Sequence, residues 1–131
     1  MSLIAGILLQ FNNRELARQI MDNIREMGKY TDATTAFAIP ESVDRGENIN
    51  AHVIVGTPGT VLNLIKKRQI DVSKIKIFVL DEADSMLDQQ GLGDSSIRIK
   101  NLMPKVGCQI VLFSATFTED VLTFAKKGLQ F

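Results

Sequence analysis

Three acidic residues within four positions are the first candidates for chemistry in this sequence. Asp81, Glu82 and Asp84 directly follow the hydrophobic run 75–80. Carboxylates this close repel one another unless a cation or a hydrogen-bond donor compensates them. A hard divalent ion such as Mg²⁺, shared with phosphate oxygens, is a natural partner, with Asp81 holding the metal and Glu82 orienting or deprotonating a water. The alternative is a helix N-terminus, whose dipole favours acidic side chains.

Two short hydroxyl side chains follow another hydrophobic run. Ser114 and Thr116 come directly after residues 108–113 and can hydrogen-bond Asp84 or a neighbouring loop. The alternative is N-capping of the helix that is predicted to begin near Thr118.

A third polar cluster, Gly56–Thr60 with Thr57–Gly59 at its centre, follows the strand-like residues 52–55. Gly59 lets a backbone N–H approach a ligand closely, and Thr57 adds a hydroxyl, which suits contacts with phosphate. The alternative is an ordinary helix start with Thr57 as the cap and Pro58 at the first helical position.

Strands and helices must alternate along the chain to position these clusters. Short apolar runs predict strands, and apolar residues at helical spacing predict the helices between them. The predicted strands are 7–9, 34–39, 52–55, 75–80 and 108–113, and the predicted helices are 13–27, 58–65, 83–88, 95–102 and 118–127. This alternation predicts an α/β fold with a doubly wound parallel sheet. In such a sheet ligands bind outside the carboxyl ends of the strands, so all three clusters are expected at the binding edge.

Composition excludes several classes of protein. The 131 residues carry 15 basic and 15 acidic side chains, so no pervasive basic field exists and any nucleic-acid contact must be local. The basic run Lys66–Arg68 lies at a predicted helix C-terminus and is interpreted as a solvated helix end rather than a nucleic-acid surface. One cysteine, Cys108, cannot form an internal disulfide, and no apolar run approaches the length of a membrane span. We expect a soluble, intracellular protein.

A phosphate-binding P-loop is missing from the sequence. That loop needs the pattern G-x-x-x-x-G-K-[ST]. The single Gly-Lys pair, Gly28-Lys29, is followed by Tyr30 and lacks the first glycine. The acidic cluster therefore has no phosphate cradle beside it in the sequence.

Taken in order, the clusters resemble motifs of the DEAD-box RNA helicases. The segments similar to motifs Ia, Ib, II and III are Asn13–Ala17, Thr57–Thr60, Val79–Asp84 and Ser114–Thr116. Their spacing is similar to that of the first RecA-like lobe of the family. Four further segments, 54–60, 78–84, 90–91 and 96–99, resemble the branch that remodels messenger ribonucleoprotein at the nuclear pore.

The resemblance implies a role for each matching residue. It implies that Asp81 and Glu82 serve Mg²⁺ and ATP, and that Asp84, Ser114 and Thr116 couple hydrolysis to strand separation. It implies that Arg14, Thr57, Pro58 and Gly59 contact the sugar-phosphate backbone of RNA, which gives binding independent of sequence.

The chain also departs from the family pattern. The Pro-Thr that the family has before Arg14 is Asn12-Asn13 here, and the double-glycine motif between Ia and Ib is absent. The adenine-reading Q motif, the P-loop and the second lobe are not in these residues. We therefore expect residues 7–131 to be a partial RecA-like domain, with residues 1–6 a disordered or extraneous N-terminus.

The resemblance implies part of an ATP-dependent RNA helicase that couples Mg-ATP hydrolysis to remodelling of RNA duplexes or ribonucleoprotein in mRNA export. The implied partners are RNA, a second RecA-like lobe and nuclear-pore export factors, with no membrane, and the implied location is cytoplasm and nucleus, at the nuclear pore. Because the phosphate cradle is missing, we expect this chain alone to be inactive. Loss of that segment should also expose apolar sheet surface and favour self-association.

Two alternatives belong to other classes. One is a non-catalytic RNA- or protein-binding module derived from a helicase lobe. The other is a phosphoacceptor receiver domain, which has a similar length and acids at strand ends. In this sequence, however, the acids follow the fourth predicted strand rather than the first and third.

Overall fold

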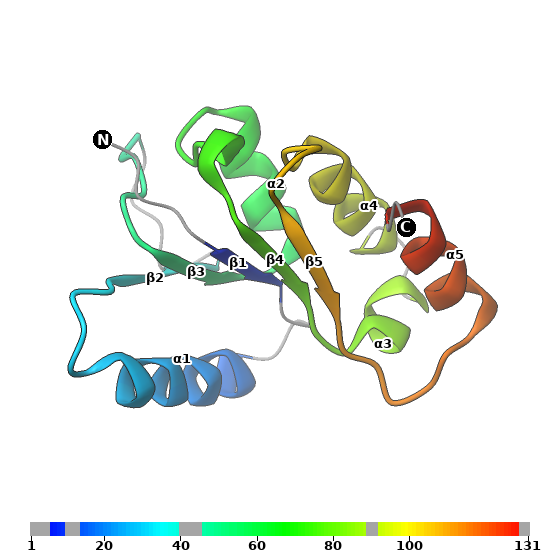
Figure 1. The fold of residues 1–131 in the computed structure, drawn as a ribbon, viewed down its shortest axis with the longest axis horizontal. Coiled ribbons are helices and arrows are strands. Elements are labelled where there is room, and N and C mark those ends of the chain that lie inside the picture. The colour runs from blue at the N-terminus through cyan, green and yellow to red at the C-terminus, as the bar shows by residue number, and fades with distance from the viewer. Residues whose placement is uncertain (1–5, 10–13, 40–45, 89–91, 129–131) are drawn as a thin grey trace.

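The computed structural model describes residues 6–9, 14–39, 46–88 and 92–128, and these form one parallel sheet with helices on both faces (Figure 1). The strand order is β2-β3-β1-β4-β5, and every neighbouring pair is parallel. The elements are β1 (Gly6–Leu9), α1 (Arg14–Gly28), β2 (Thr35–Ala38), β3 (Val53–Gly56), α2 (Pro58–Lys66), the 3₁₀ turn η1 (Val72–Lys74), β4 (Ile77–Leu80), α3 (Ala83–Asp88), α4 (Leu92–Leu102), β5 (Gln109–Leu112) and α5 (Glu119–Gly128). The predicted doubly wound α/β fold is confirmed.

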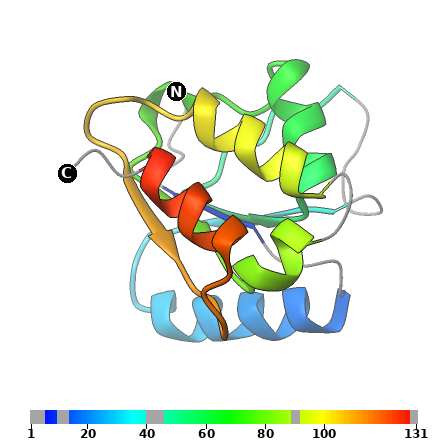
Figure 2. The same ribbon diagram turned by 90° about the vertical axis from the view of Figure 1, so that its right-hand side faces the viewer.

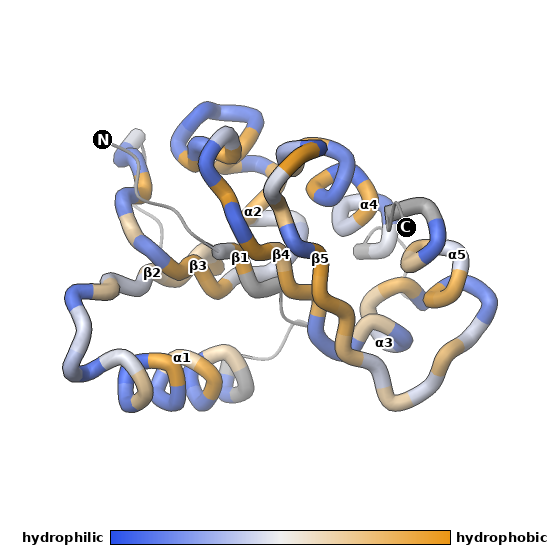
Figure 3. Tube along the Cα trace, viewed as in Figure 1, coloured by the Kyte–Doolittle hydropathy of each residue, from blue (hydrophilic) through white to orange (hydrophobic). Residues whose placement is uncertain are grey.

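The two faces of the sheet carry different numbers of helices. Side chains of α2, α3, α4 and α5 form one large core with Ile7, Ile54 and Phe78, whereas α1 lies alone on the opposite face (Figures 1 and 2). The alternation of side chains along each strand explains this division, because Val53 and Val55 face α1 while Ile54 between them faces the other helices. Figure 3 shows the strands as the most apolar part of the chain, as burial on two faces requires.

Helix α1 forms from the apolar spacing that the sequence displays. Ala17 and Met21 are buried against Val55, and Ile20 and Ile24 pack beside them. The remaining positions of the helix are mostly polar and exposed, so the helix is amphipathic as predicted. The sequence also predicts Asn12 as the N-cap of this helix, but Asn12 lies outside the described residues.

Two predicted boundaries are wrong by a few residues. The strand predicted from Ile75 begins at Ile77, because Asp71 caps a 3₁₀ turn: its Oδ1 accepts hydrogen bonds from the amide (3.0 Å) and hydroxyl (2.7 Å) of Ser73. Helix α4 begins at Leu92 rather than at residue 95 and so includes Gly93. A Cβ on Gly93 would lie only 3.0 Å from the carbonyl oxygen of Leu87, so close packing of α3 on α4 favours glycine there.

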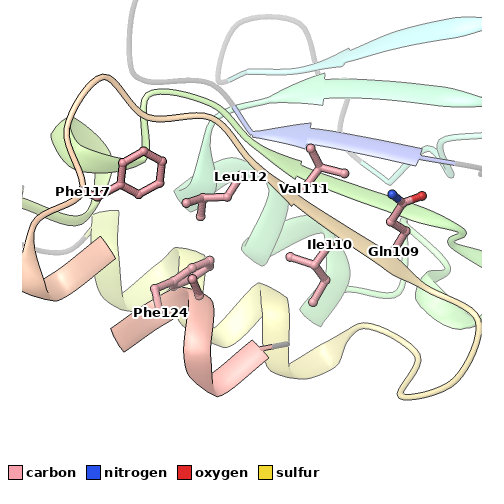
Figure 4. Close-up of a pocket in the computed structure, with 7 residues that line it drawn as sticks. Gln109, Ile110, Val111, Leu112, Phe117 and Phe124 are labelled. Atoms are coloured by element: carbon pink, nitrogen blue, oxygen red, sulfur yellow. The ribbon is translucent and has the colours of Figure 1, made fainter. Parts of the chain in front are cut away.

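Strand β5 carries one of the two open edges of the sheet. It is the last strand in the order, and within the described part of the chain nothing pairs with its outer edge. A groove of 360 Å³ runs between this strand and α5, and in Figure 4 Ile110 and Leu112 point into it toward Phe124. On the face that α1 occupies, Ile77 of β4 is 42% exposed because α1 packs on β3 instead. Apolar side chains of the sheet are therefore accessible at Ile77 and along this groove.

Within the described ranges, no helix is both long enough and apolar enough to cross a membrane.

Candidate nucleotide and RNA site

The acidic and hydroxyl clusters meet at the carboxyl ends of β4 and β5. These strands pair in register, with Leu80 opposite Leu112. Beyond the last pair, the amide of Phe113 donates to the carbonyl oxygen of Leu80 (2.9 Å), and the amide of Ala83 donates to the carbonyl oxygen of Phe113 (2.9 Å). The ladder therefore continues past the strand ends and holds the two turns side by side, as the sheet-edge argument predicted.

Asp84 is hydrogen-bonded to the hydroxyl cluster. The Thr116 hydroxyl and amide both donate to Oδ2 of Asp84, at 2.8 Å and 3.2 Å. The Ser114 hydroxyl accepts the amide N–H of Asp84 at 3.1 Å and donates to the carbonyl oxygen of Thr116. The Thr116 hydroxyl bond, the largest cause, holds the pKa of the Asp84 carboxyl below its usual range.

This network decides between the two interpretations of the hydroxyls. Ser114 and Thr116 bond Asp84, whereas the cap of α5 is Thr118, whose hydroxyl accepts the amide N–H of Val121 at 3.3 Å. Because the amide and carboxylate of Asp84 both bond this turn, displacing either turn must break several hydrogen bonds together. The arrangement can transmit a movement from the acidic turn to the hydroxyl turn.

Asp81 and Glu82 form a tight turn with an unusual backbone. Oδ1 of Asp81 accepts the amide N–H of Glu82 at 2.9 Å, and the Glu82 carbonyl oxygen begins α3 by accepting the amide N–H of Met86. Glu82 has φ +50°, in the left-handed region, which costs a non-glycine residue about 1–2 kcal/mol. Both acidic side chains are half-buried. Strained backbone at a non-glycine residue is typical of functional sites, which makes Glu82 a candidate for one.

The acidic turn fits a magnesium ion held by few protein ligands. In the described ranges, no three His, Cys, Asp or Glu side chains gather closely enough to hold a metal by themselves. Asp84 is bonded to Thr116, so Asp81 and Glu82 are the acids left for a ligand. Mg²⁺ commonly keeps several waters and takes one or two carboxylates together with substrate phosphates. Asp81 suits that role, and the remaining ligands would come from water and phosphate.

The cluster Thr57–Gly59 begins α2 at the same edge of the sheet. Pro58 occupies the first helical position as predicted, but the predicted cap is wrong: the Thr57 hydroxyl donates to the hydroxyl of Thr60 (3.3 Å) and makes no capping bond. A side chain on Gly59 would meet nothing within 4 Å. Packing therefore does not explain this glycine, which is the second residue of α2. Close approach of a ligand to its backbone would explain it.

Gly56, at the end of β3, is glycine for a different reason. A Cβ there would lie 2.5 Å from the carbonyl oxygen of Ala38 and 2.7 Å from Cγ2 of Val61. Gly56 therefore lets β2 and α2 approach the end of β3, which places Thr57 beside β2, where its amide donates to the Ala38 carbonyl oxygen (3.2 Å). The sequence analysis did not identify Gly56 as a positioning residue.

Arg14 is the first residue of α1, which follows β1 at this same edge (Figure 1). Its side chain lies outside the described part of the structure, so only its backbone position supports the predicted role.

Two other features of the site were missed by sequence reasoning: the left-handed Glu82 and the carbonyl of Phe113 that joins the two turns. Neither has a sequence signal, because both depend on backbone geometry.

Comparison with known proteins identifies relatives over most of the chain. A sequence profile described as "DEAD/DEAH box helicase" matches residues 6–124. "ATP-dependent RNA helicase dbp5" of Schizosaccharomyces pombe is 62% identical over 115 residues, which are 88% of this chain and 23% of that protein. "ATP-dependent RNA helicase DBP5" of Saccharomyces cerevisiae S288c is 56% identical, over 88% of this chain and 24% of that protein. The chain thus spans about a quarter of the length of these curated relatives.

Solved structures give the same result for the fold. The structure "S. cerevisiae Dbp5 bound to RNA and ADP BeF3" matches with a TM-score of 0.88 and 51% identity, over 98% of this chain and 32% of that one. A DEAD box protein from Methanococcus jannaschii matches with a TM-score of 0.81 and 34% identity, over 96% of this chain and 35% of that one. Another similar structure is that of S. cerevisiae dbp5 L327V bound to nup159, gle1 H337R, ip6 and ADP.

Proposed function

The chain belongs to the DEAD/DEAH box helicase family, and from that premise we propose that it is part of the first RecA-like lobe of an ATP-dependent RNA helicase. The observation that carries the proposal is the joining of the two turns: Thr116 binds Asp84 while Asp81 and Glu82 remain at the edge. This geometry suits coupling between a nucleotide-binding turn and the rest of the lobe.

Each acidic residue has a separate task in this proposal. Asp81 would hold Mg²⁺, which when bound neutralises charge on the phosphates of ATP. Glu82 holds a water by accepting its hydrogen bond and can take its proton. Asp84 holds the hydroxyl turn through Thr116, so that a shift of the acidic turn moves both together.

RNA binding is assigned to the N-termini of α1 and α2. Arg14 supplies a positive charge, and Thr57, Pro58 and Gly59 present a hydroxyl and an open backbone surface to a sugar-phosphate chain. Such contacts read no bases, so binding is independent of sequence and sensitive to salt.

We test the RNA contact with labelled single-stranded RNA and the chain itself. Arg14→Ala should lower the slope of log affinity against log salt by about 0.7, the value for one lost phosphate contact on a single strand. Arg18→Ala, on the same helix and exposed, is the matched control and should leave the slope unchanged. Equal effects of the two variants would contradict the assignment of Arg14.

The proposal also predicts that this chain alone releases no phosphate from Mg-ATP, with or without RNA, because the lysine and amides of a phosphate cradle are missing from its sequence. Turnover that disappears in Glu82→Gln would overturn this part of the account.

The second candidate function, a non-catalytic RNA- or protein-binding module, rests on the same missing cradle. It predicts RNA binding that does not change when nucleotide is added.

We infer partners of the whole protein from the same relatives. A second RecA-like lobe, RNA and nuclear-pore export factors are the proposed partners, with the nuclear pore, cytoplasm and nucleus as the proposed location. The solved structure of S. cerevisiae dbp5 L327V bound to nup159 and gle1 H337R supports this proposal. Capture of this chain by purified homologues of those two proteins tests it, and no capture by either would count against it.

The open edge of β5 supports a further proposal, that the isolated chain self-associates. The exposed strand edge and the apolar groove beside it are the kind of surface that pairs with another copy. Light scattering during size exclusion should show mass rising with concentration, and Val111→Lys should reduce this rise. A monomer at all concentrations would contradict the proposal.

A further inference from the structure

The amino ends of the strands carry a concentration of positive charge. Within residues 66–76 there are five basic side chains and one acidic one, although the whole chain has no net charge. We call the basic edge the set Lys66, Lys67, Arg68, Lys74, Lys76 and Lys105. All six are exposed, and among the described residues none of them forms an ion pair.

The basic edge brings together three separate segments. Lys66, Lys67 and Arg68 end α2, Lys74 ends η1, and Lys76 directly precedes β4. The amide of Gln109 donates to the carbonyl oxygen of Lys76 at 2.8 Å, which places the loop containing Lys105 beside β4. A helix dipole explains the cations at the end of α2, but it does not explain those that η1 and the α4–β5 loop add.

The one acid within this segment, Asp71, offsets one of the five positive charges. Asp71 accepts two hydrogen bonds from Ser73, and these bonds, the side-chain bond first, hold the pKa of its carboxyl below the usual range, with the nearby Lys74 charge a further cause. Arg68 lies three residues away in the left-handed region, with φ +59°. Together with Asn48 and Asn50 it lines an open pocket of 540 Å³, whose wall also includes Asp71. Arginine and amide groups can donate hydrogen bonds to an anion entering this pocket.

Helix α2 joins the proposed RNA contact to the basic edge. Its exposed residues Gly59, Asn63 and Lys66 fall on one side, while its apolar residues Val61, Leu62, Leu64 and Ile65 are buried. Gly59 and Asn63 are four residues apart, and Asn63 and Lys66 are three apart, so these exposed residues lie in one row along the helix. Nine helical residues span about 14 Å. This row contains no acidic and no large apolar side chain.

We propose that RNA contacting Thr57–Gly59 continues along the exposed row of α2 and that its phosphates bind the basic edge at Lys66, Lys67 and Arg68. The inference rests on the proposed RNA contact and extends it to a longer RNA site. Charge complementarity selects a polyanion, and the lack of large apolar side chains in the row disfavours an acidic protein, whose binding usually needs buried anchors. Lys66–Arg68, interpreted from the sequence as a solvated helix end, gain a different interpretation from the charges that η1 and the α4–β5 loop add.

The experiment measures binding of two labelled oligouridylates, one of 5 and one of 15 nucleotides, to the chain and to two double variants. Lys66→Gln with Lys67→Gln removes two charges from the basic edge. Lys29→Gln with Lys126→Gln removes two exposed charges elsewhere and is the matched control. All these side chains are exposed, so the variants should unfold in urea at nearly the same midpoint as the parent chain.

The expected result depends on RNA length. For the longer RNA, the Lys66/Lys67 variant should bind about tenfold more weakly, with a salt slope lower by about 1.4, because two phosphate contacts are lost. For the shorter RNA its affinity should fall less than threefold. Equal losses for the two double variants, or equal losses for the two RNA lengths, would overturn the path along α2. Binding of polyglutamate as strong as that of RNA would also overturn it. If the parent chain binds neither RNA, the proposed function fails with it.

Discussion

Two glycines three residues apart should respond in opposite ways to the same substitution. Gly56 and Gly59 flank the turn that begins α2, and each can be changed to alanine without adding charge or polarity. At Gly56 the new methyl group would lie 2.5 Å from the Ala38 carbonyl oxygen and 2.8 Å from its Cβ. At Gly59 it would have nothing within 4 Å. The comparison separates a glycine kept for packing from one that packing does not require.

The magnitude follows from which atoms can move. The Val61 methyl near Gly56 belongs to a buried β-branched side chain, and the Ala38 oxygen belongs to the backbone of β2. Strands β2 and β3 must therefore separate locally by about 1 Å to reach the distances usual in packed interiors. Overpacking of this kind costs about 1–3 kcal/mol, and a backbone clash belongs at the upper end. For Gly59→Ala the helix propensity gain is at most about 1 kcal/mol. The free energies of unfolding should therefore differ by about 3 kcal/mol.

Urea unfolding followed by circular dichroism measures this difference. With a slope of about 1.5 kcal/mol per molar urea, the two midpoints should lie about 2 M apart, Gly56→Ala below the parent chain and Gly59→Ala at or above it. If Gly56→Ala unfolds within 0.3 M of the parent, β2, β3 and α2 do not pack as described, and the reasoning fails. RNA affinity tests the functional role of Gly59. The Gly59→Ala chain should bind RNA more weakly than the parent chain although its stability is undiminished.

Three further predictions concern the turns and the core. Glu82→Gly should raise the free energy of unfolding by about 1 kcal/mol, because glycine adopts the left-handed backbone at no steric cost. A lower midpoint of urea unfolding than that of the parent chain would show that the backbone at Glu82 is not strained. Asp84 has a lowered pKa in the folded state, so its contribution to stability is complete above its ordinary pKa near 4 and is lost as the pH falls through the folded value. Asp84→Asn should therefore flatten the decline of the unfolding midpoint below pH 4, and an unchanged decline would contradict this. Lys100→Ala should lower the free energy of unfolding in urea by about 2 kcal/mol, because Nζ of Lys100 donates to the carbonyl oxygen of Phe124 at 2.8 Å and lies 4.2 Å from the centroid of its ring. A decrease of less than about 0.5 kcal/mol would contradict this prediction.

The sequence by itself determined the order of the elements and the edge at which the site lies. Continuous apolar runs such as residues 77–80 are typical of strands in a parallel sheet between helices, and parallel strands all present their carboxyl ends at one edge. The positions of Asp81 and Ser114 next to such runs were therefore enough to predict their proximity. The amphipathic spacing of α1 was equally local and was equally predictable.

Other features depended on contacts between distant residues, so only the tertiary structure decided them. Asp84 and Thr116 are 32 residues apart, and their hydrogen bond exists because β4 and β5 pair in register and hold the two turns together. The close packing at Gly56 is set by β2 and α2, and the gathering of Lys74 and Lys105 at the basic edge follows from where their segments enter the sheet. Residue types and spacing specify what each segment forms, whereas strand pairing and helix packing specify which side chains meet.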